Sequence, residues 1–334
     1  MSITIKDVAR EAGVSVATVS RVLNGSANVS EASAKLVNDT IQRLNYSPNF
    51  LGRNLRKRET NVILVIMPSS EHSLYGSIIS GMQDYANKIG YDIISAVSNS
   101  TSFVEARQMD MLFNKTVDGA VLLGTQFSAK ELNEMSRGYN IALCCEGVEG
   151  ADVLTVAVND EQAGYDAAKA LIDLGHKKIA LISVNSDAVS SRKRENGYIR
   201  ALKDNGIEIR QEYIWHNTYD YINGALAMEQ FMSLPDRPTA VFAVSDLLAA
   251  AAIRKATDMG LCVGKDVSVM GFDNITMCEM FIPSISTVAQ PCRKMGEFVI
   301  KKLIDNINSD IKDAHYYNLD HEVILRASTG RRIS

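Results

Sequence analysis

The sequence lacks the segments that direct a chain to or across a membrane. No apolar stretch approaches the roughly 18 residues that a spanning helix needs, and the first ten residues contain no apolar signal-peptide segment. The five cysteines form no Cys-x-x-Cys pair and no zinc-ligand spacing. We therefore expect a cytoplasmic protein with reduced thiols, no bound metal and no membrane partner.

Motifs that mark catalysis are absent too. No Gly-x-Gly-x-x-Gly or P-loop is present to hold a nucleotide cofactor. Neither His-Glu-x-x-His nor Gly-x-Ser-x-Gly occurs, and the five histidines are scattered. A Ser–His–Asp site would have to be assembled by the fold from distant residues. We predict that the protein has no catalytic residues, uses no cofactor and is not an enzyme.

Charge is distributed unevenly along the 334 residues. Residues 1–60 contain nine Lys or Arg and five Asp or Glu, a net charge of +4. The remaining residues contain 26 Lys or Arg and 34 Asp or Glu, a net charge of −8. The overall net charge of −4 therefore conceals a basic segment. A small basic module on an acidic body is typical of a DNA-binding headpiece. The length predicts two or three folding units.

The first 44 residues carry the signals of three short helices. Thr4 fits an N-cap with Asp7 in the first turn, and Gly13 and Ser15 fit the end of one helix and the start of the next. One apolar face of the first helix has helical spacing: Ile5, Val8, Ala9 and Ala12. A second helix follows at about 16–23 and a third after Ser30. This arrangement predicts a helix-turn-helix.

The second helix of such a module enters the major groove of DNA. We predict that the residues facing base edges are Val16, Ala17 and Arg21. We predict that the contacts to the DNA backbone are made by Thr4, Ser15, Thr18, Ser20 and Asn24. The alternative is a helical hairpin without a DNA function, with Arg21 solvated.

Residues 48–60 are predicted to form a hinge. Leucines are mixed with four cations between residues 50 and 58, a segment too short to be a stable helix alone. It would fold against a partner, and this composition suits the minor groove of DNA, where apolar side chains are wedged between base steps. The alternative, a flexible charged linker, describes the same segment without DNA.

These segments resemble a known family. IKDVAREAGVS at residues 5–15 and ATVSRVLN at residues 17–24 resemble the headpiece of the LacI/GalR repressors, and YSPN at residues 46–49 resembles the junction with their hinge helix. The resemblance implies that Leu55 is inserted into the minor groove, beside Asn49, Arg53 and Arg56. Short segments also resemble the cytidine-repressor and catabolite-control branches.

Residues 61–334 alternate apolar runs with amphipathic segments. The runs predict buried parallel strands at residues 62–67, 93–97, 120–123 and 141–145, then at 154–158, 179–183, 240–244 and 267–271. Glycines at 90, 175, 206 and 260 lie where helices should end. The alternation predicts two doubly wound α/β sheets, so the predicted domains are residues 1–47, 48–60 and 61–334.

The resemblance continues through the core, in VDG at 117–119, LGHKKIA at 174–180, RPTAVF at 237–242 and GFDN at 271–274. It implies two Rossmann-like lobes of the type I periplasmic-binding-protein kind, joined by three crossings. The N-lobe would comprise about 61–158 and 291–320, and the C-lobe about 159–290 and 321–334. A ligand of such sheets binds outside the carboxyl ends of the strands, here between the lobes.

Matched positions give candidate effector contacts. The resemblance implies contacts from Tyr75, Arg194, Tyr219 and Asp273, with Asn159 and Asp160 in another lining region. Aromatic faces, a charged fork and a carboxylate suit a polyhydroxylated ligand. The sequence departs from the family at residues 72–75, where HSLY replaces an Asn-Pro-aromatic-aromatic run.

Together these features predict a sequence-specific transcription regulator, acting as a repressor. As a homodimer it would bind a pseudo-palindromic operator in double-stranded DNA. A small hydroxyl-rich effector would modulate this binding, a sugar first and a nucleoside or a phosphoprotein corepressor as alternatives. A transport-type sugar-binding protein fits the core alone, but not the basic headpiece.

Overall fold

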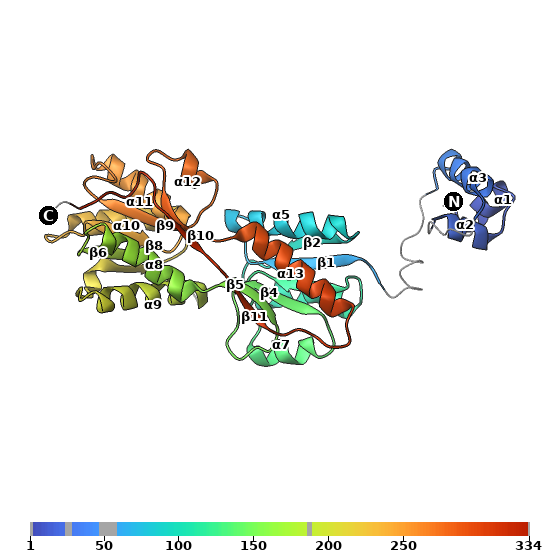
Figure 1. Cartoon of the computed structure of the whole chain (residues 1–334), viewed down its shortest axis with the longest axis horizontal. Helices are drawn as coiled ribbons and strands as arrows, with labels where there is room; N and C mark the ends of the chain where they lie inside the picture. The colour runs from blue at the N-terminus through green and yellow to red at the C-terminus, as the bar shows by residue number, and fades with distance from the viewer. Residues whose placement is uncertain (1–2, 24–28, 47–58, 186–188, 333–334) are drawn as a thin grey trace. The chain divides into compact units, whose positions relative to one another are not determined.

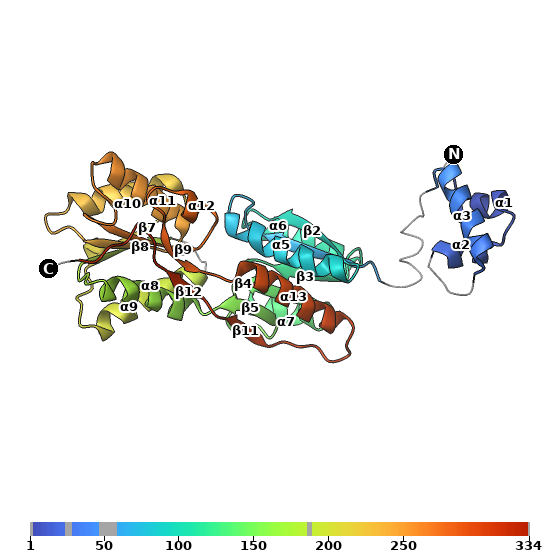
Figure 2. The same ribbon diagram turned by 45° about the horizontal axis from the view of Figure 1, so that its top comes forward.

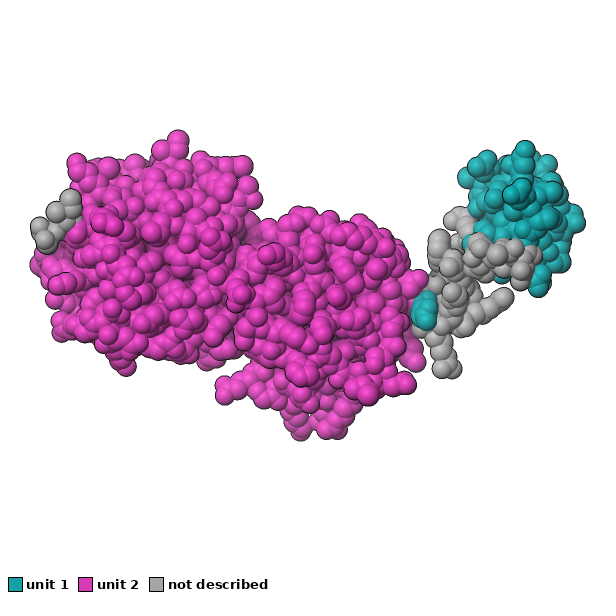
Figure 3. All heavy atoms as spheres, in the orientation of Figure 1, with its two compact units in different colours: residues 1–59 teal, residues 60–334 magenta. Residues whose placement is uncertain are grey.

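The computed structural model describes residues 3–23, 29–46, 59–185 and 189–332. The chain divides into two units, residues 1–59 and residues 60–334 (Figure 3). Five predicted DNA contacts lie outside the described residues: Asn24, Asn49, Arg53, Leu55 and Arg56.

The first unit contains three short helices around a small apolar core. They are α1 (Ile5–Glu11), α2 (Val16–Leu23) and α3 (Glu31–Arg43) (Figure 1). The Thr4 hydroxyl donates to Asp7 Oδ2 at 2.7 Å, and the Thr18 amide donates to Ser15 Oγ at 3.1 Å. Gly13, between α1 and α2, has a φ of 63°. These caps confirm the predicted helix ends. The buried apolar side chains are Val8, Ala9, Ala12, Val19 and Val37.

The second unit holds two six-stranded sheets, one in each lobe. The N-lobe sheet has the order β11-β5-β4-β3-β1-β2, and every pair in it is parallel. Its strands are β1 (Val62–Met67), β2 (Asp92–Val97), β3 (Gly119–Leu122), β4 (Ile141–Cys145), β5 (Leu154–Val158) and β11 (Tyr316–Leu319).

The C-lobe sheet has the order β12-β10-β9-β8-β6-β7, and only its edge strand β12 is antiparallel to its neighbour. Its strands are β6 (Ile179–Val184), β7 (Ile214–Asn217), β8 (Ala240–Ala243), β9 (Ser268–Asp273), β10 (Ser286–Ala289) and β12 (Glu322–Ile324).

Helices cover both faces of each sheet. In the N-lobe, α5 (Ser73–Lys88) and α13 (Cys292–Ile307) pack on one face, and α6 (Ser102–Phe113) and α7 (Ala129–Ser136) on the other. In the C-lobe, α8 (Asp160–Asp173) and α9 (Val189–Asp204) lie opposite α10 (Tyr221–Ser233) and α11 (Asp246–Asp258) (Figure 2). Short helices are α12 (Met277–Met280) and the 3-10 turn η1 (Gln211–Tyr213).

The chain passes between the lobes three times. The connections are β5 to α8, β10 to α13 and β11 to β12. All three run side by side at the junction between the lobes (Figure 1). The carboxyl ends of the parallel strands in the two sheets face each other across this junction. This is the two-lobed arrangement of type I periplasmic binding proteins.

The strands differ from the sequence prediction at the sheet edges. All eight predicted strands are present, but β2 is an edge strand with Ile94 exposed, rather than a buried one. The edge strands β7, β11 and β12 were not predicted because they are short and carry polar or half-exposed residues. Strand β10 is a buried inner strand, and it was not predicted because it is short and begins with Ser and Thr. Edge strands are half covered, so a continuous apolar run is not required of them.

Helices α8 and α9, and likewise α5 and α13, approach each other so closely that only glycine fits at the contact. A Cβ on Gly164 of α8 would lie 2.2 Å from the Arg194 carbonyl oxygen, and one on Gly197 of α9 would lie 2.1 Å from the Glu161 carbonyl oxygen. The contact between α5 and α13 is built in the same way, with Gly81 and Gly296. These are backbone atoms, which cannot move aside as a flexible side chain does.

We therefore expect Gly197→Ala to destabilise the core by about 1–3 kcal/mol, as overpacking does. The measurement is urea unfolding of the full chain. Gly76→Ala is the matched control, because Gly76 lies in α5 with no atom within 4 Å of the added Cβ. It should be neutral or stabilising by up to about 1 kcal/mol through helix propensity. Equal unfolding midpoints for the two variants would contradict the argument.

Candidate functional site

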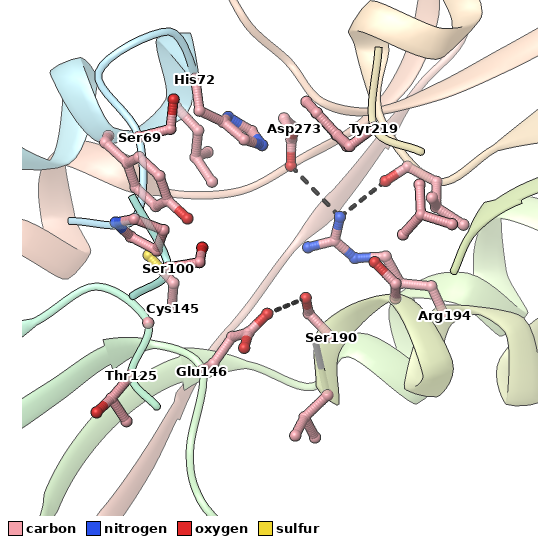
Figure 4. A pocket seen from close by; sticks show the side chains of 18 of the residues that line it. Ser69, His72, Ser100, Thr125, Cys145, Glu146, Ser190, Arg194, Tyr219 and Asp273 are labelled. Atoms are coloured by element: carbon pink, nitrogen blue, oxygen red, sulfur yellow. Dashed lines mark hydrogen bonds and ion pairs between the residues drawn. The ribbon is translucent and has the colours of Figure 1, made fainter. Parts of the chain in front are cut away.

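A cavity of about 660 Å³ lies between the lobes at the carboxyl ends of the parallel strands (Figure 4). The N-lobe contributes residues at or after the ends of β1, β2, β3 and β4, and the C-lobe contributes residues at or after the ends of β6, β7, β8, β9 and β10. This is the position where open α/β sheets bind ligands. Its polar and aromatic lining includes Ser69, His72, Tyr75, Ser100, Thr125, Glu146, Ser190, Arg194, Tyr219, Asp273 and Gln290.

Arg194 forms the centre of the C-lobe wall. Its Nε donates to Asp160 Oδ1 at 2.8 Å, and its Nη1 donates to the Val244 carbonyl oxygen at 2.8 Å. Nη1 also lies 3.7 Å from Asp273 Oδ1, and the guanidinium carbon lies 3.7 Å from the centre of the Phe272 ring. A guanidinium stays protonated even when buried, so this charge must be balanced within the wall.

Asp273 ends β9 in a backbone conformation that few residues adopt. Its φ is 113° and that of the following Asn274 is 56°, both in the region that favours glycine. Asp273 Oδ1 accepts a hydrogen bond from Gln290 Nε2 at 2.8 Å. Burial raises the pKa of the Asp273 carboxyl, while Arg194 acts in the opposite direction. Strain of this kind is often found where a side chain is held for binding.

Aromatic rings from both lobes meet in the cavity. The centres of the His72 and Tyr219 rings are 4.9 Å apart, with an angle of 19° between the planes. The His72 and Tyr75 rings are 5.0 Å apart and tilted by 44°. On another part of the wall, Ser190 of the C-lobe hydrogen-bonds Glu146 of the N-lobe (Figure 4). The two lobes are thus in contact through side chains on both sides of the cavity.

The structure brings together four of the six predicted effector contacts. Tyr75, Arg194, Tyr219 and Asp273 all line the cavity. The other two, Asn159 and Asp160, are not among its described lining residues. Asn159 caps α8 by accepting the Gln162 amide at 3.1 Å, and Asp160 is buried behind Arg194 as its ion-pair partner. Asn159 and Asp160 thus lie at the N-terminus of α8, which packs behind the C-lobe wall of the cavity and contributes no described lining residue.

Glu146, Ser190 and Gln290 also line the cavity but were not predicted from the sequence, and His72 was predicted only as part of a departure from the family. No motif marks these residues. A positional signal exists, because Glu146 and Gln290 directly follow β4 and β10. Residues just beyond the carboxyl ends of strands are the expected ligand contacts in this architecture.

In the headpiece, the predicted base-reading residues share one exposed face of α2. Val16, Ala17 and Arg21 are all exposed, whereas Val19 on the opposite face is buried. Ser15 and Thr18 hydrogen-bond each other at 2.9 Å, and the Thr4 hydroxyl is engaged by Asp7. The DNA contacts of all these residues remain predictions.

Among the described residues, no three side chains of His, Cys, Asp or Glu are grouped as metal ligands. Within the same residues, no helix has both the length and the apolar character needed to cross a membrane.

A helix-turn-helix unit followed by a two-lobed binding core defines a class of DNA-binding regulators. The chain matches the family model described as bacterial regulatory proteins, lacI family, over residues 4–49, and a periplasmic binding protein-like domain over residues 168–329. Catabolite control protein A of Priestia megaterium is 34% identical over 331 residues, covering 98% of this chain and 100% of that protein.

Solved structures of transcription regulators are similar over nearly the whole chain. CelR in complex with cellobiose is 30% identical and similar with a TM-score of 0.73, covering 98% of this chain and 99% of that one. The lac repressor dimer bound to operator and the anti-inducer ONPF, at 23% identity, shows the same fold with a TM-score of 0.89, covering 98% and 99%. The chain belongs to the LacI family, and it is a DNA-binding transcription regulator, not an enzyme.

We expect Asp160→Ala to destabilise the core by about 3–5 kcal/mol, because it leaves the buried Arg194 charge without its closest partner. Asp173→Ala is the matched control, since Asp173 forms an exposed ion pair with Lys169 on the same helix and should cost less than about 1 kcal/mol. Urea unfolding of both variants is the measurement. A similar loss of stability in the two would show that burial of the pair is unimportant.

For the headpiece, we expect Arg21→Ala to weaken binding to the operator by about 1–3 kcal/mol and to relax base preference. Binding to random DNA should change little. Arg10→Ala removes a cation on α1 and should affect specific and random DNA alike. The measurement is fluorescence anisotropy with a site selected from a random library. An equal loss on both DNAs for Arg21→Ala would exclude base reading by this side chain.

Proposed function

We propose that this regulator is a repressor whose operator binding is controlled by a compact, hydroxyl-rich effector without net negative charge, in the first place a sugar. The observation that carries the proposal is the charge of the cavity wall. Among the described lining residues, Arg194 alone has a permanent positive charge, and Asp160 and Asp273 already balance it. Glu146 adds a further carboxylate. A phosphate would meet no uncommitted cation there.

The same groups suit sugar hydroxyls. Carboxylates such as Asp273 and Glu146 accept hydrogen bonds from hydroxyls, and such charge-assisted bonds are strong. Tyr75 and Tyr219 offer faces for the apolar side of a pyranose ring. About 660 Å³ lies within the range of ligand pockets, roughly 300–1,000 Å³. The solved complex of CelR with cellobiose, 30% identical, supports a ligand of this class.

A nucleoside is the second candidate, because three aromatic rings, His72, Tyr75 and Tyr219, meet in the cavity. A planar base stacks on such rings as readily as a pyranose does. Its ribose hydroxyls would use the same carboxylates.

We propose that the protein acts in the cytoplasm as a homodimer on a pseudo-palindromic operator, because two-fold protein symmetry matches two-fold DNA symmetry. The effector would change DNA affinity only if it binds one arrangement of the lobes more tightly than the other. The His72–Tyr219 and Glu146–Ser190 contacts join the two lobes, so they distinguish the arrangement of the lobes seen here from one in which the lobes are apart.

The test is calorimetry of the full chain with neutral sugars, nucleosides and sugar phosphates. We expect binding from the neutral compounds, and added stability of about 2.7 kcal/mol at 100 times the Kd. Binding of phosphorylated compounds alone would show the assignment of ligand class to be wrong.

We expect Asp273→Ala to weaken effector binding at least tenfold and to abolish the effector's influence on DNA, because a hydrogen bond to a charged group contributes about 1.5–3 kcal/mol. DNA affinity without effector should be nearly unchanged. Asp258→Ala, an exposed carboxylate paired with Arg254 on α11, is the control and should change neither. Unaltered effector binding in Asp273→Ala would remove Asp273 from the site.

A further inference from the structure

His72 is the first residue of the segment 72–75, in which this chain departs from the family's Asn-Pro-aromatic-aromatic run, and it has an unusual position. It is the N-cap residue of α5, yet its side chain makes no capping hydrogen bond. Instead the imidazole points into the cavity, toward the C-lobe (Figure 4). Among the residues that the structure describes, none donates to or accepts from its ring nitrogens. The imidazole instead contacts the rings of Tyr75 and Tyr219.

The principal ring contact crosses between the lobes. His72 belongs to the N-lobe, whereas Tyr219 lies in the C-lobe between β7 and α10. Ring centres 4.9 Å apart with planes at 19° describe an offset stack. Tyr75, one turn along α5, supports the imidazole from its own lobe at 5.0 Å. Because neither lobe alone contains both members, the stack exists only when the lobes are closed.

The surroundings of the imidazole favour its neutral form. Burial lowers the pKa of His72, the positive charge of Arg194 acts in the same direction, and Asp273 opposes both. The other titratable groups lining the cavity are Tyr75, Tyr219, Glu146 and Cys145, and none of these carries a positive charge. A protonated ring would keep its attraction to the face of Tyr219 but would lose hydration and face Arg194.

We propose that the His72–Tyr219 pair is a proton-sensitive latch that holds the two lobes closed when the imidazole is neutral and releases them when it is protonated. Opening returns the ring to water, where its pKa is about 6.5. The closed state is therefore favoured above that pH, and it weakens as the pH falls below it. Histidine is the side chain suited to such a change near neutral pH.

The consequence for regulation rests on the proposed function, since closure matters to DNA binding only if an effector uses it. Acidification would then weaken effector binding and shift the regulator toward its effector-free behaviour. The latch itself needs no effector and is tested without one. Its failure and the failure of the proposed ligand class are therefore separate results.

The experiment measures closure and titration in the full chain. A spin label on Cys262, an exposed C-lobe cysteine, is paired with one on Lys88→Cys at the exposed end of α5, and the other four cysteines are buried. Dilution with unlabelled protein isolates distances within one chain. Histidine labelled with ¹³C gives the titration of His72 by nuclear magnetic resonance, assigned from its loss in His72→Phe.

We expect the label distance to lengthen as the pH is lowered from 8 to 5.5, and His72 to titrate below 6.5. His72→Phe keeps the stack without a titrating group, so its distance should stay short at both pH values. Tyr219→Leu should lengthen the distance at pH 8 and return the His72 midpoint to about 6.5. His315→Phe, an exposed histidine elsewhere, should behave as the parent chain.

Three results would overturn the proposal. The first is an ordinary titration midpoint for His72 in the parent chain. The second is an acid-induced change of distance in His72→Phe equal to that of the parent, which would assign the change to other groups. The third is a distance between the labels that does not respond to pH in the parent chain.

Discussion

The C-lobe wall depends on the need to balance one buried guanidinium. The charge of Arg194 is balanced by Asp160 from α8, the Val244 carbonyl after β8 and Asp273 at the end of β9. Asp160 reaches it because α8 and α9 cross at Gly164 and Gly197, where no Cβ fits. The helix crossing, the ends of two strands and the strained Asp273 are thus parts of one arrangement. Removing the charge would leave the carboxylates of the wall without a common partner.

The sequence was sufficient for elements with strong local signals. Capping residues such as Thr4 and Ser15 fixed the headpiece helices, and long apolar runs located eight strands, because buried parallel strands need apolar residues on both faces. It was insufficient for β7 and β11, which contain Trp-His-Asn and Tyr-Tyr-Asn runs. Such edge strands exist because a neighbouring strand is present to pair with them, and that neighbour is distant in the chain.

The residues of the candidate site also divide into those that the sequence predicts and those that it does not. Family resemblance supplied Tyr75, Arg194, Tyr219 and Asp273, and the cavity contains all four. It also supplied Asn159 and Asp160, which are not among the described lining residues, since resemblance gives a position along the chain and not the direction in which a side chain points. The role of His72 could not be read from its neighbours in sequence, because it is defined by Tyr219 in the other lobe.

The last crossings of the chain have a consequence for how the protein is made. Helix α13 supplies Met295, Val299 and Leu303 to the core beneath α5, and β11 completes the same sheet, although both follow the entire C-lobe helical layer in sequence. On the ribosome, the N-lobe therefore emerges first but stays unfinished, with the apolar side of α5 uncovered. The usual order of N-terminal domain first does not apply here. During this interval, the uncovered apolar surface favours aggregation of the nascent chain.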